Sequence, residues 1–243
     1  MKRSGFPVKK SLALLLDPDK TGDESLDRII EIASENSIDY ILVGGSITFS
    51  GIDDLIVKIK ERCNIPVILF PGNLLQLTRQ ADRILLLSLI SGRNPELLIG
   101  NHVLAAPYLK DMREKITSVG YILINCGART SVEYMSQTES IPPDKPDIVV
   151  ATAIAGELLG LEMIYLEGGS GAANPVPPEI ISAVRNNVSI PLAVGGGIRN
   201  SEEVRQAYLA GADLVILGNG CEKNPELLRE ASRIRDLLRK DSG

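Results

Sequence analysis

The chain has 243 residues, a formal net charge of −5 and 44% hydrophobic residues, with aromatic residues at only 4%. The negative charge and the lack of tryptophan argue against a nucleic-acid surface, which normally carries a basic field and stacking aromatic rings. Three scattered cysteines without a CxxC pair indicate reduced thiols in a cytoplasmic protein. No apolar run is long enough for a secretory signal or a spanning helix, so we expect no integral membrane segment.

Short apolar runs alternate along the chain with stretches of helical periodicity. The predicted strands are residues 11–16, 40–43, 66–70, 83–89, 120–124, 163–166, 191–194 and 214–217. The predicted helices are residues 21–36, 52–63, 94–103, 147–159, 177–187, 201–210 and 225–239, and residues 200–203 are expected to form a capping box. The polar, proline-containing segment 129–146 is expected to be a loop that either acts as a lid or substrate wall or is mobile. Eight strands with intervening helices predict a single-domain (β/α)8 TIM barrel over residues 1–243, rather than a doubly wound sheet.

Glycine-rich turns follow the last three predicted strands, at residues 168–171, 195–197 and 218–220. Glycine allows positive φ and close approach of the backbone to a ligand, and consecutive free N–H groups bind anions. Any one of these turns also fits a tight connection between a strand and a helix. The three together predict a phosphate site, because this fold usually binds phosphate after strands 7 and 8.

Acidic side chains follow the first predicted strand, where Asp17 and Asp19 flank Pro18. By itself an Asp-Pro-Asp sequence is more common as a turn that begins a helix. Next to a phosphate site a second interpretation is Mg²⁺ binding, because this ion prefers one or two carboxylates together with substrate phosphates. Ser46, after the second strand, is a candidate to supply a neighbouring hydroxyl group.

Tyr165 and Glu167 lie two residues apart and therefore point to the same side of the sixth strand. Such a pair suits binding and deprotonation of a hydroxyl group, although it also suits a turn cap and a core tyrosine. His102 is the only histidine, so the chain holds neither a Ser-His-Asp triad nor a multi-histidine zinc site. We expect His102 to be packed or on the surface.

Five motifs occur in a fixed order: LDPDK at 16–20, VGGS at 43–46, YLEGGSG at 165–171, VGGGI at 194–198 and LGN at 217–219. Together they resemble the geranylgeranylglyceryl phosphate synthase family, which includes heptaprenylglyceryl phosphate synthases. The resemblance implies transfer of a polyprenyl group, with geranylgeranyl as the expected donor, to the 3-hydroxyl of sn-glycerol 1-phosphate. This reaction forms the first ether bond of archaeal-type membrane lipids.

The same resemblance implies roles for individual residues. Asp17 and Ser46 match the positions that hold Mg²⁺, and Glu167 matches the residue that contacts the glycerol hydroxyls and is the expected base. The positions that match the substrate-binding segments are Tyr165, Leu166, Glu167, Gly168, Gly169, Ser170, Gly171, Gly196, Gly197, Gly218 and Asn219. Some members carry a lysine two residues before the metal-binding Asp, whereas this chain has Leu15, as in the branch that lacks the lysine.

The partners implied are the two substrates and further copies of the chain in a dimer or hexamer, in the cytoplasm or peripherally at the membrane. Two alternatives remain open. One is a sugar-phosphate isomerase, which shares the later glycine turns, and the other is a non-catalytic barrel that binds a phosphorylated ligand.

Overall fold

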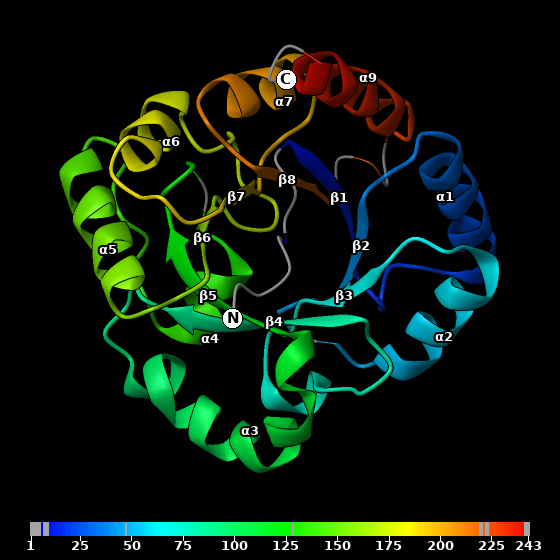
Figure 1. Cartoon of the computed structure of the whole chain (residues 1–243), viewed down its shortest axis with the longest axis horizontal. Coiled ribbons are helices and arrows are strands. Elements are labelled where there is room, and N and C mark those ends of the chain that lie inside the picture. Colours follow the sequence, from blue (N-terminus) through cyan, green and yellow to red (C-terminus); the bar gives the residue numbers. More distant parts are fainter. Residues whose placement is uncertain are drawn as a thin grey trace.

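A computed structural model describes residue 6 and residues 10–46, 48–127, 129–218, 221 and 224–240. Its strands are β1 (Ser11–Leu16), β2 (Tyr40–Val43), β3 (Val67–Leu69), β4 (Arg83–Leu89), β5 (Ile116–Leu123), β6 (Met163–Glu167), β7 (Leu192–Gly195) and β8 (Leu214–Leu217). Each strand pairs in parallel with the next, and β1 also pairs with β8, which closes the sheet into a barrel (Figure 1). The predicted (β/α)8 barrel is therefore confirmed.

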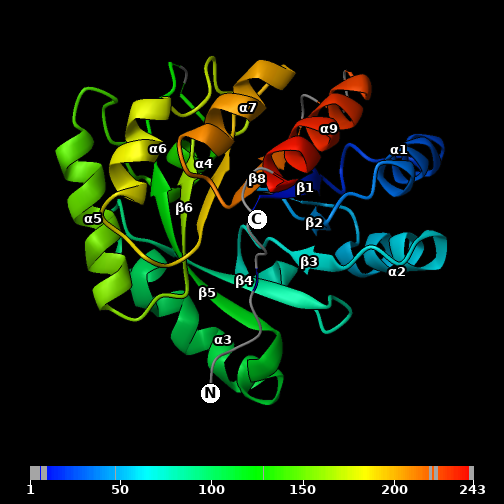
Figure 2. The ribbon, with the colours of Figure 1, turned by 45° about the horizontal axis from the view of Figure 1, so that its top comes forward.

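Helices surround the strands on the outside of this barrel (Figure 1). They are α1 (Asp23–Glu35), α2 (Ile52–Arg62), α3 (Asn101–Leu109), α5 (Pro146–Leu158), α6 (Pro178–Arg185), α7 (Ser201–Leu209) and α9 (Glu226–Lys240). The short helix α4 (Ser131–Ser136) lies instead at the C-terminal ends of the strands. Shorter helical segments are η1 (Leu74–Gln76), η2 (Glu96–Gly100) and η3 (Lys110–Lys115). Figure 2 shows α1 and α2 on one side of the strands and α5 and α6 on the other.

Alternate residues of each strand point into the barrel or toward the helices, as a period of two requires. The barrel interior contains Ala13, Leu42 and Tyr165, whereas Leu12 and Leu166 belong to the outer core that packs against the helices. Both faces of every strand are thus apolar, which explains why the strands read as continuous hydrophobic runs.

Acidic residues fasten the strands together at the N-terminal end of the barrel. An acidic residue stands directly before each even-numbered strand. Its carboxylate accepts a hydrogen bond from a backbone N–H near the start of the odd-numbered strand that comes before it in the chain. The pairs are Asp39 with Leu12, Asp82 with Val67, Glu162 with Ser118, and Asp213 with Leu192, at 2.8–2.9 Å. This pattern stabilises the end of the barrel that lies opposite the usual active-site face.

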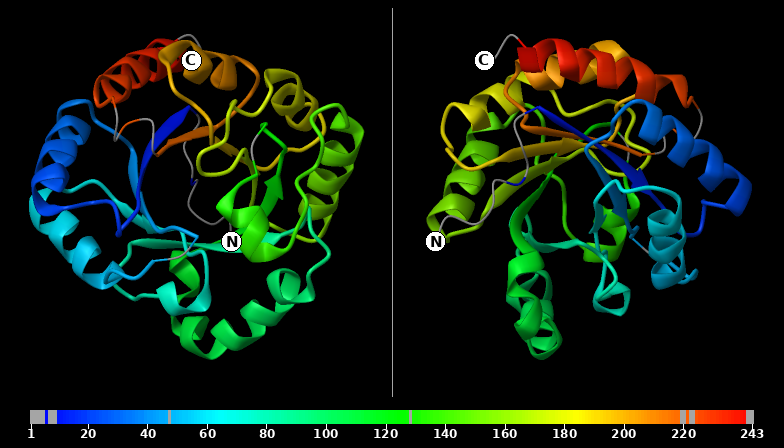
Figure 3. Two further views of the ribbon diagram at one scale, coloured as in Figure 1. Left: turned by 180° about the vertical axis from the view of Figure 1, so that it is seen from behind. Right: turned by 45° about the vertical axis from the view of Figure 1, so that its right-hand side comes forward.

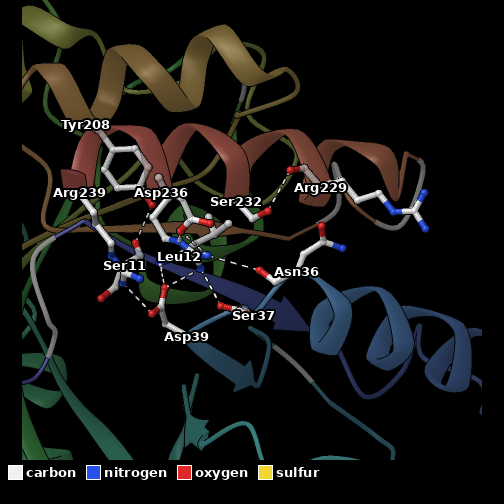
Figure 4. A network of polar contacts seen from close by, with 11 residues as sticks. Ser11, Leu12, Asn36, Ser37, Asp39, Tyr208, Arg229, Ser232, Asp236 and Arg239 are labelled. Atoms are coloured by element: carbon white, nitrogen blue, oxygen red, sulfur yellow. Dashed lines mark hydrogen bonds and ion pairs between the residues drawn. The ribbon is translucent and has the colours of Figure 1, made fainter. Parts of the chain in front are cut away.

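The Asp39 carboxylate also anchors α9 (Figure 4). Arg235, only 1% exposed, donates to Asp39 at 3.0 Å and to the carbonyl of Ser37 at 2.8 Å, and Arg239 donates to the other Asp39 oxygen at 2.7 Å. Tyr208 of α7 donates its hydroxyl to the carbonyl of Ser11 at 2.8 Å. Helices α7 and α9 therefore hold the seam between β1 and β2 in place.

The sequence-based prediction was wrong or incomplete in three segments. The expected loop 129–146 contains α4, whose Thr130 side chain and Glu133 form a capping box. At the expected capping box, Asn200 does accept from the Glu203 N–H, but the Glu203 carboxylate accepts from Arg199 N instead of Asn200 N. The expected helix 94–103 is the π-helical η2 followed by α3, which continues to Leu109.

Candidate active site

A cavity of about 640 Å³ opens at the C-terminal ends of the strands. Most of the residues predicted from the sequence to form the site line it: Asp17, Ser46, Tyr165, Glu167, Gly169, Ser170, Gly171, Gly196, Gly197 and Gly218. Seen from the side opposite to Figure 1, the short green α4 lies in front of the strands, and its Ser131 and Val132 also line the cavity (Figure 3, left). The glycine turns and the acidic end of β1 therefore face one another across a single cavity.

Three of the predicted site residues do not line the cavity or lie outside the residues that the structure describes. Leu166 is fully buried in the outer core, because it alternates with Tyr165 and Glu167 along β6. Gly168 does not line the cavity, since its N–H bonds the carbonyl of Gly195 at 2.9 Å. Asn219 lies outside the described residues.

Glu167 is the buried carboxylate of the cavity, with 6% of its surface exposed. Its Oε1 accepts a hydrogen bond from the Gly169 N–H at 2.6 Å, and the hydroxyls of Tyr165 and Tyr121 also donate to it. Burial raises the pKa of Glu167 above its ordinary value, although these three hydrogen bonds oppose the shift. Burial and the neighbouring carboxylate also raise the pKa of Tyr121 and of Tyr165 well above the usual range, so both phenols remain protonated donors.

The glycine turn after β7 makes room for this carboxylate. Gly196 has φ of +85°, and a Cβ atom there would lie 2.5 Å from Glu167 Oε1 and 2.6 Å from Gly169 N. A side chain at position 196 is therefore excluded both by backbone conformation and by space. The β6 and β7 turns fit against each other only because glycine occupies this position.

The two carboxylates that follow β1, Asp17 and Asp19, have different roles. The Asp17 side chain faces the cavity and accepts from Lys20 Nζ at 2.6 Å and from Asp19 N at 3.1 Å. Asp19 accepts instead from the N–H groups of Phe49 and Ser50, at 2.7–3.0 Å, and these bonds hold its pKa below the ordinary value. Asp17 is therefore the carboxylate available to a ligand, and Asp19 fixes the loop after β2.

An aromatic cluster that the sequence analysis missed lies beside Glu167. The ring centroid of Phe70 is 5.6 Å from that of Tyr165 and 6.1 Å from that of Tyr121, and the two tyrosine rings are 5.2 Å apart. Phe70 directly follows β3 and Tyr121 lies in β5, and both belong to the inner core of the barrel, where sequence alone indicates ordinary core packing. Tyr121 of β5 is paired with Tyr165 of β6 in the sheet, and this register cannot be read from either strand alone.

A second cavity, an apolar groove of about 310 Å³, continues from the first. The residues common to both are Gly45, Ser46, Phe70, Tyr121 and Val132. Beyond them the groove is lined mainly by leucines and other apolar side chains of β4, η1, η2, α3, α4 and the segment around η1, including Leu74, Leu77, Leu86, Leu87, Leu89, Leu97, Ala105 and Met135.

His102 also lines this groove, so the expected packed role is the one found. Its Nε2 lies 3.0 Å from Ser88 Oγ, and burial lowers its pKa, which favours the neutral ring. The groove therefore presents a largely uncharged, apolar surface that begins at the Glu167 cavity.

Other features bear on the class of protein. Among the described residues no helix is both long and apolar enough to cross a bilayer. The described residues also contain no group of three or more His, Cys, Asp or Glu side chains that could hold a metal ion. A closed parallel barrel with glycine turns after β6 and β7, Gly218 after β8 and a buried carboxylate defines the class of phosphate-binding TIM-barrel proteins.

Comparison with known proteins specifies the family: residues 8–235 match the PcrB family, and the chain belongs to it. The chain is 45% identical over 227 residues to the geranylgeranylglyceryl phosphate synthase of Spirosoma linguale, covering 93% of this chain and 91% of that one. It is 39% identical to the synthase of the same name from Thermococcus gammatolerans, covering 92% and 89%. Among solved structures, (S)-3-O-geranylgeranylglyceryl phosphate synthase from Thermoplasma acidophilum, in complex with substrate sn-glycerol-1-phosphate, matches with a TM-score of 0.86 at 30% identity over 94% of this chain and 93% of that one.

Proposed function

We propose that the protein transfers a polyprenyl group, geranylgeranyl in the first instance, from its diphosphate to the 3-hydroxyl of sn-glycerol 1-phosphate. The observation that carries this proposal is the position of Glu167, a buried carboxylate between the glycine turns and the start of an apolar groove. A phosphorylated polar acceptor fits the first cavity, and a long hydrocarbon fits the second. The names of the family relatives support the same reaction.

The acceptor is held by backbone and carboxylate together. Gly171, Gly196 and Gly197 offer backbone N–H groups to the phosphate, which needs no lysine because amide dipoles bind anions. Glu167 then reaches the glycerol hydroxyls, and its raised pKa suits a group that must accept a proton near neutral pH.

In the reaction, the acceptor hydroxyl oxygen forms a bond to prenyl C1 while the bond from C1 to the diphosphate oxygen breaks. The electron pair leaves with the diphosphate, and the hydroxyl proton passes to Glu167. The faces of Phe70, Tyr121 and Tyr165 line the cavity where positive charge develops at C1, and aromatic faces stabilise such charge. The deep position of this cluster also excludes water that would compete with the hydroxyl.

We infer that the diphosphate is bound with Mg²⁺ at the end of β1. The donor set fits, since Mg²⁺ is commonly held by one or two carboxylates plus substrate phosphates, and Asp17 and Ser46 both line the cavity. When bound, the ion would neutralise the leaving diphosphate. Lys20, which pairs with Asp17, is placed to move to the phosphates when Asp17 takes another partner.

We further propose a cytoplasmic homo-oligomer. The support is a set of exposed apolar side chains: Ile99, Val103 and Leu104 of η2 and α3, Ile148 and Leu158 of α5, and Leu159 directly after α5. Flat apolar helix faces suit burial against a second copy of the chain. Light scattering of Val103→Asp should then give a smaller particle than the parent protein, and an unchanged mass would rule out α3 as the interface.

The function is tested by incubating the full chain with labelled sn-glycerol 1-phosphate, geranylgeranyl diphosphate and Mg²⁺. Glu167→Gln should lower the rate by about 10²- to 10⁴-fold, the usual contribution of a general base, while binding of glycerol phosphate changes little. Glu157→Gln is the matched control, because this carboxylate accepts bonds from Ser189 at the N-terminal end of β7, outside the cavity. Full activity of Glu167→Gln would disprove the assignment of the base.

The same assay separates the alternatives. An isomerase would convert a sugar phosphate without consuming a prenyl diphosphate, and a binding protein would retain glycerol phosphate without releasing diphosphate. Omission of Mg²⁺ should abolish product formation, and full activity in a metal chelator would contradict the role assigned to Asp17.

A further inference from the structure

Four exposed apolar side chains surround the mouth of the groove; we refer to them as the apolar rim. They are Phe49, Leu75, Tyr134 and Met135, which are 91%, 96%, 70% and 53% exposed. They follow β2, β3 and β5, so they lie at the C-terminal end of the barrel, where both cavities open. Met135 itself lines the groove.

The segments that carry the rim are held in place rather than loosely attached. The Asp19 carboxylate bonds the Phe49 N–H at 2.9 and 3.0 Å. The Leu75 N–H bonds Asn73 Oδ1 at 2.9 Å. Gln76 joins the two loops, because its Nε2 donates to the carbonyl of Gly45 at 2.8 Å. Backbone polar groups next to the exposed side chains thus already have partners, which favours transfer of these side chains into an apolar phase.

We propose that the apolar rim inserts into the surface of a lipid bilayer and that the prenyl substrate enters the groove directly from it. This inference rests on the proposed function, because a groove that binds a long hydrocarbon must exchange it with a phase that dissolves hydrocarbon. The rim side chains come from three separate segments, namely the loop after β2, η1 and α4, and project at the end of the barrel where the groove opens. Such projecting apolar side chains suit insertion into a membrane interface, whereas the exposed apolar residues of α3 and α5 suit a protein partner.

The surroundings of Tyr134 fit the same partner. The Arg129 guanidinium lies 5.7 Å from the centroid of the Tyr134 ring. Tyrosine is enriched at membrane interfaces, and arginine can keep its charged end in water while its stem lies against apolar surface. The overall charge of −5 indicates that apolar insertion rather than attraction to anionic lipid drives the association.

The test is co-sedimentation of the full chain with phosphatidylcholine vesicles. Phe49→Ser combined with Leu75→Ser should reduce vesicle binding at least tenfold, since two exposed apolar anchors are removed. The matched control is Leu209→Ser combined with Leu237→Ser. These residues are 53% and 62% exposed at the C-terminal ends of α7 and α9, away from the rim, so this control should bind like the parent protein. Equal binding of both double variants, or no binding by the parent protein, would overturn the proposal.

A second measurement separates this inference from the proposed function. With a short, water-soluble prenyl diphosphate and no vesicles, the rim variant should match the parent rate, because neither Phe49 nor Leu75 lines a cavity. When geranylgeranyl diphosphate is supplied in vesicles, the rate of the rim variant should fall in proportion to its weaker vesicle binding. An unchanged rate would contradict entry of the substrate from the bilayer. If the parent protein binds vesicles through the rim but forms no product in either assay, the proposed function is refuted while membrane binding by the rim is still supported.

Discussion

Replacing Gly196 by alanine tests how the glycine turn supports Glu167. The backbone at this position has φ of +85°, which costs a residue with a Cβ about 1–2 kcal/mol. The added Cβ would also lie 2.5 Å from Glu167 Oε1, so the carboxylate must move and give up its 2.6 Å bond to the Gly169 N–H. A hydrogen bond to a charged group contributes about 1.5–3 kcal/mol, which corresponds to about a 10- to 150-fold loss in kcat/KM for glycerol phosphate.

The matched control for this change is Gly160→Ala. Gly160 has φ of +82°, but a Cβ there would meet nothing within 4 Å, and it lies after α5, outside the cavity. Both variants should lose stability from backbone strain in denaturant unfolding, and Gly196→Ala should lose more because its Cβ would also lie 2.6 Å from Gly169 N. Only Gly196→Ala should lose activity. If kcat/KM of Gly196→Ala stays at the parent value, contact with the β7 turn does not position the carboxylate, and the reasoning fails.

Three further changes follow from the structure. Tyr121→Phe removes a donor that lowers the pKa of Glu167, so the acid limb of the kcat/KM profile should move to higher pH; an unmoved limb would contradict the contact. Asp213→Ala leaves the buried N–H of Leu192 without its carboxylate partner and should cost about 1–3 kcal/mol in urea unfolding, whereas an unchanged midpoint would show that the N-terminal acids are dispensable. Burial raises the pKa of Cys126 to about 12, so about one thiol in 10⁴ is ionised at pH 8, and peptide mapping after iodoacetamide treatment of the folded protein should find Cys126 unmodified; rapid labelling would refute its burial.

Local patterns carried enough information for the barrel and for the position of the phosphate turns. The strands are apolar on both faces, and α1, α2, α6, α7 and α9 are amphipathic, so the order of the elements could be read without tertiary information. Gly169 and Gly196 could be assigned to one edge because parallel strands all end on the same side of the barrel. The pairing of Tyr165 with Glu167 follows from strand parity alone.

Features that depend on contacts between distant segments could not be predicted in the same way. Tyr121 lies more than 40 positions before Glu167, and an aromatic residue in mid-strand is most often simple core. The role of Asp19 depends on the loop around Phe49, 30 positions away. The α4 helix did have a local signal, because Thr130 and Glu133 have the spacing of a capping box, but the surrounding polar and proline residues favoured a loop.

Leu166 illustrates the limit of transferring a motif as a whole. The YLEGGSG segment was assigned to substrate binding in one piece, yet β6 directs Leu166 into the outer core and only its neighbours into the cavity. Strand geometry thus divides a contiguous motif into residues that pack and residues that face a ligand.

The central claim is that this barrel joins a prenyl group to glycerol phosphate at the Glu167 cavity. It is tested most directly by mass spectrometry of the product formed from sn-glycerol 1-phosphate, geranylgeranyl diphosphate and Mg²⁺. The account predicts a prenylglyceryl phosphate whose ether bond survives alkaline hydrolysis, formed with one diphosphate released per product. Binding of glycerol phosphate without formation of any ether product would contradict it.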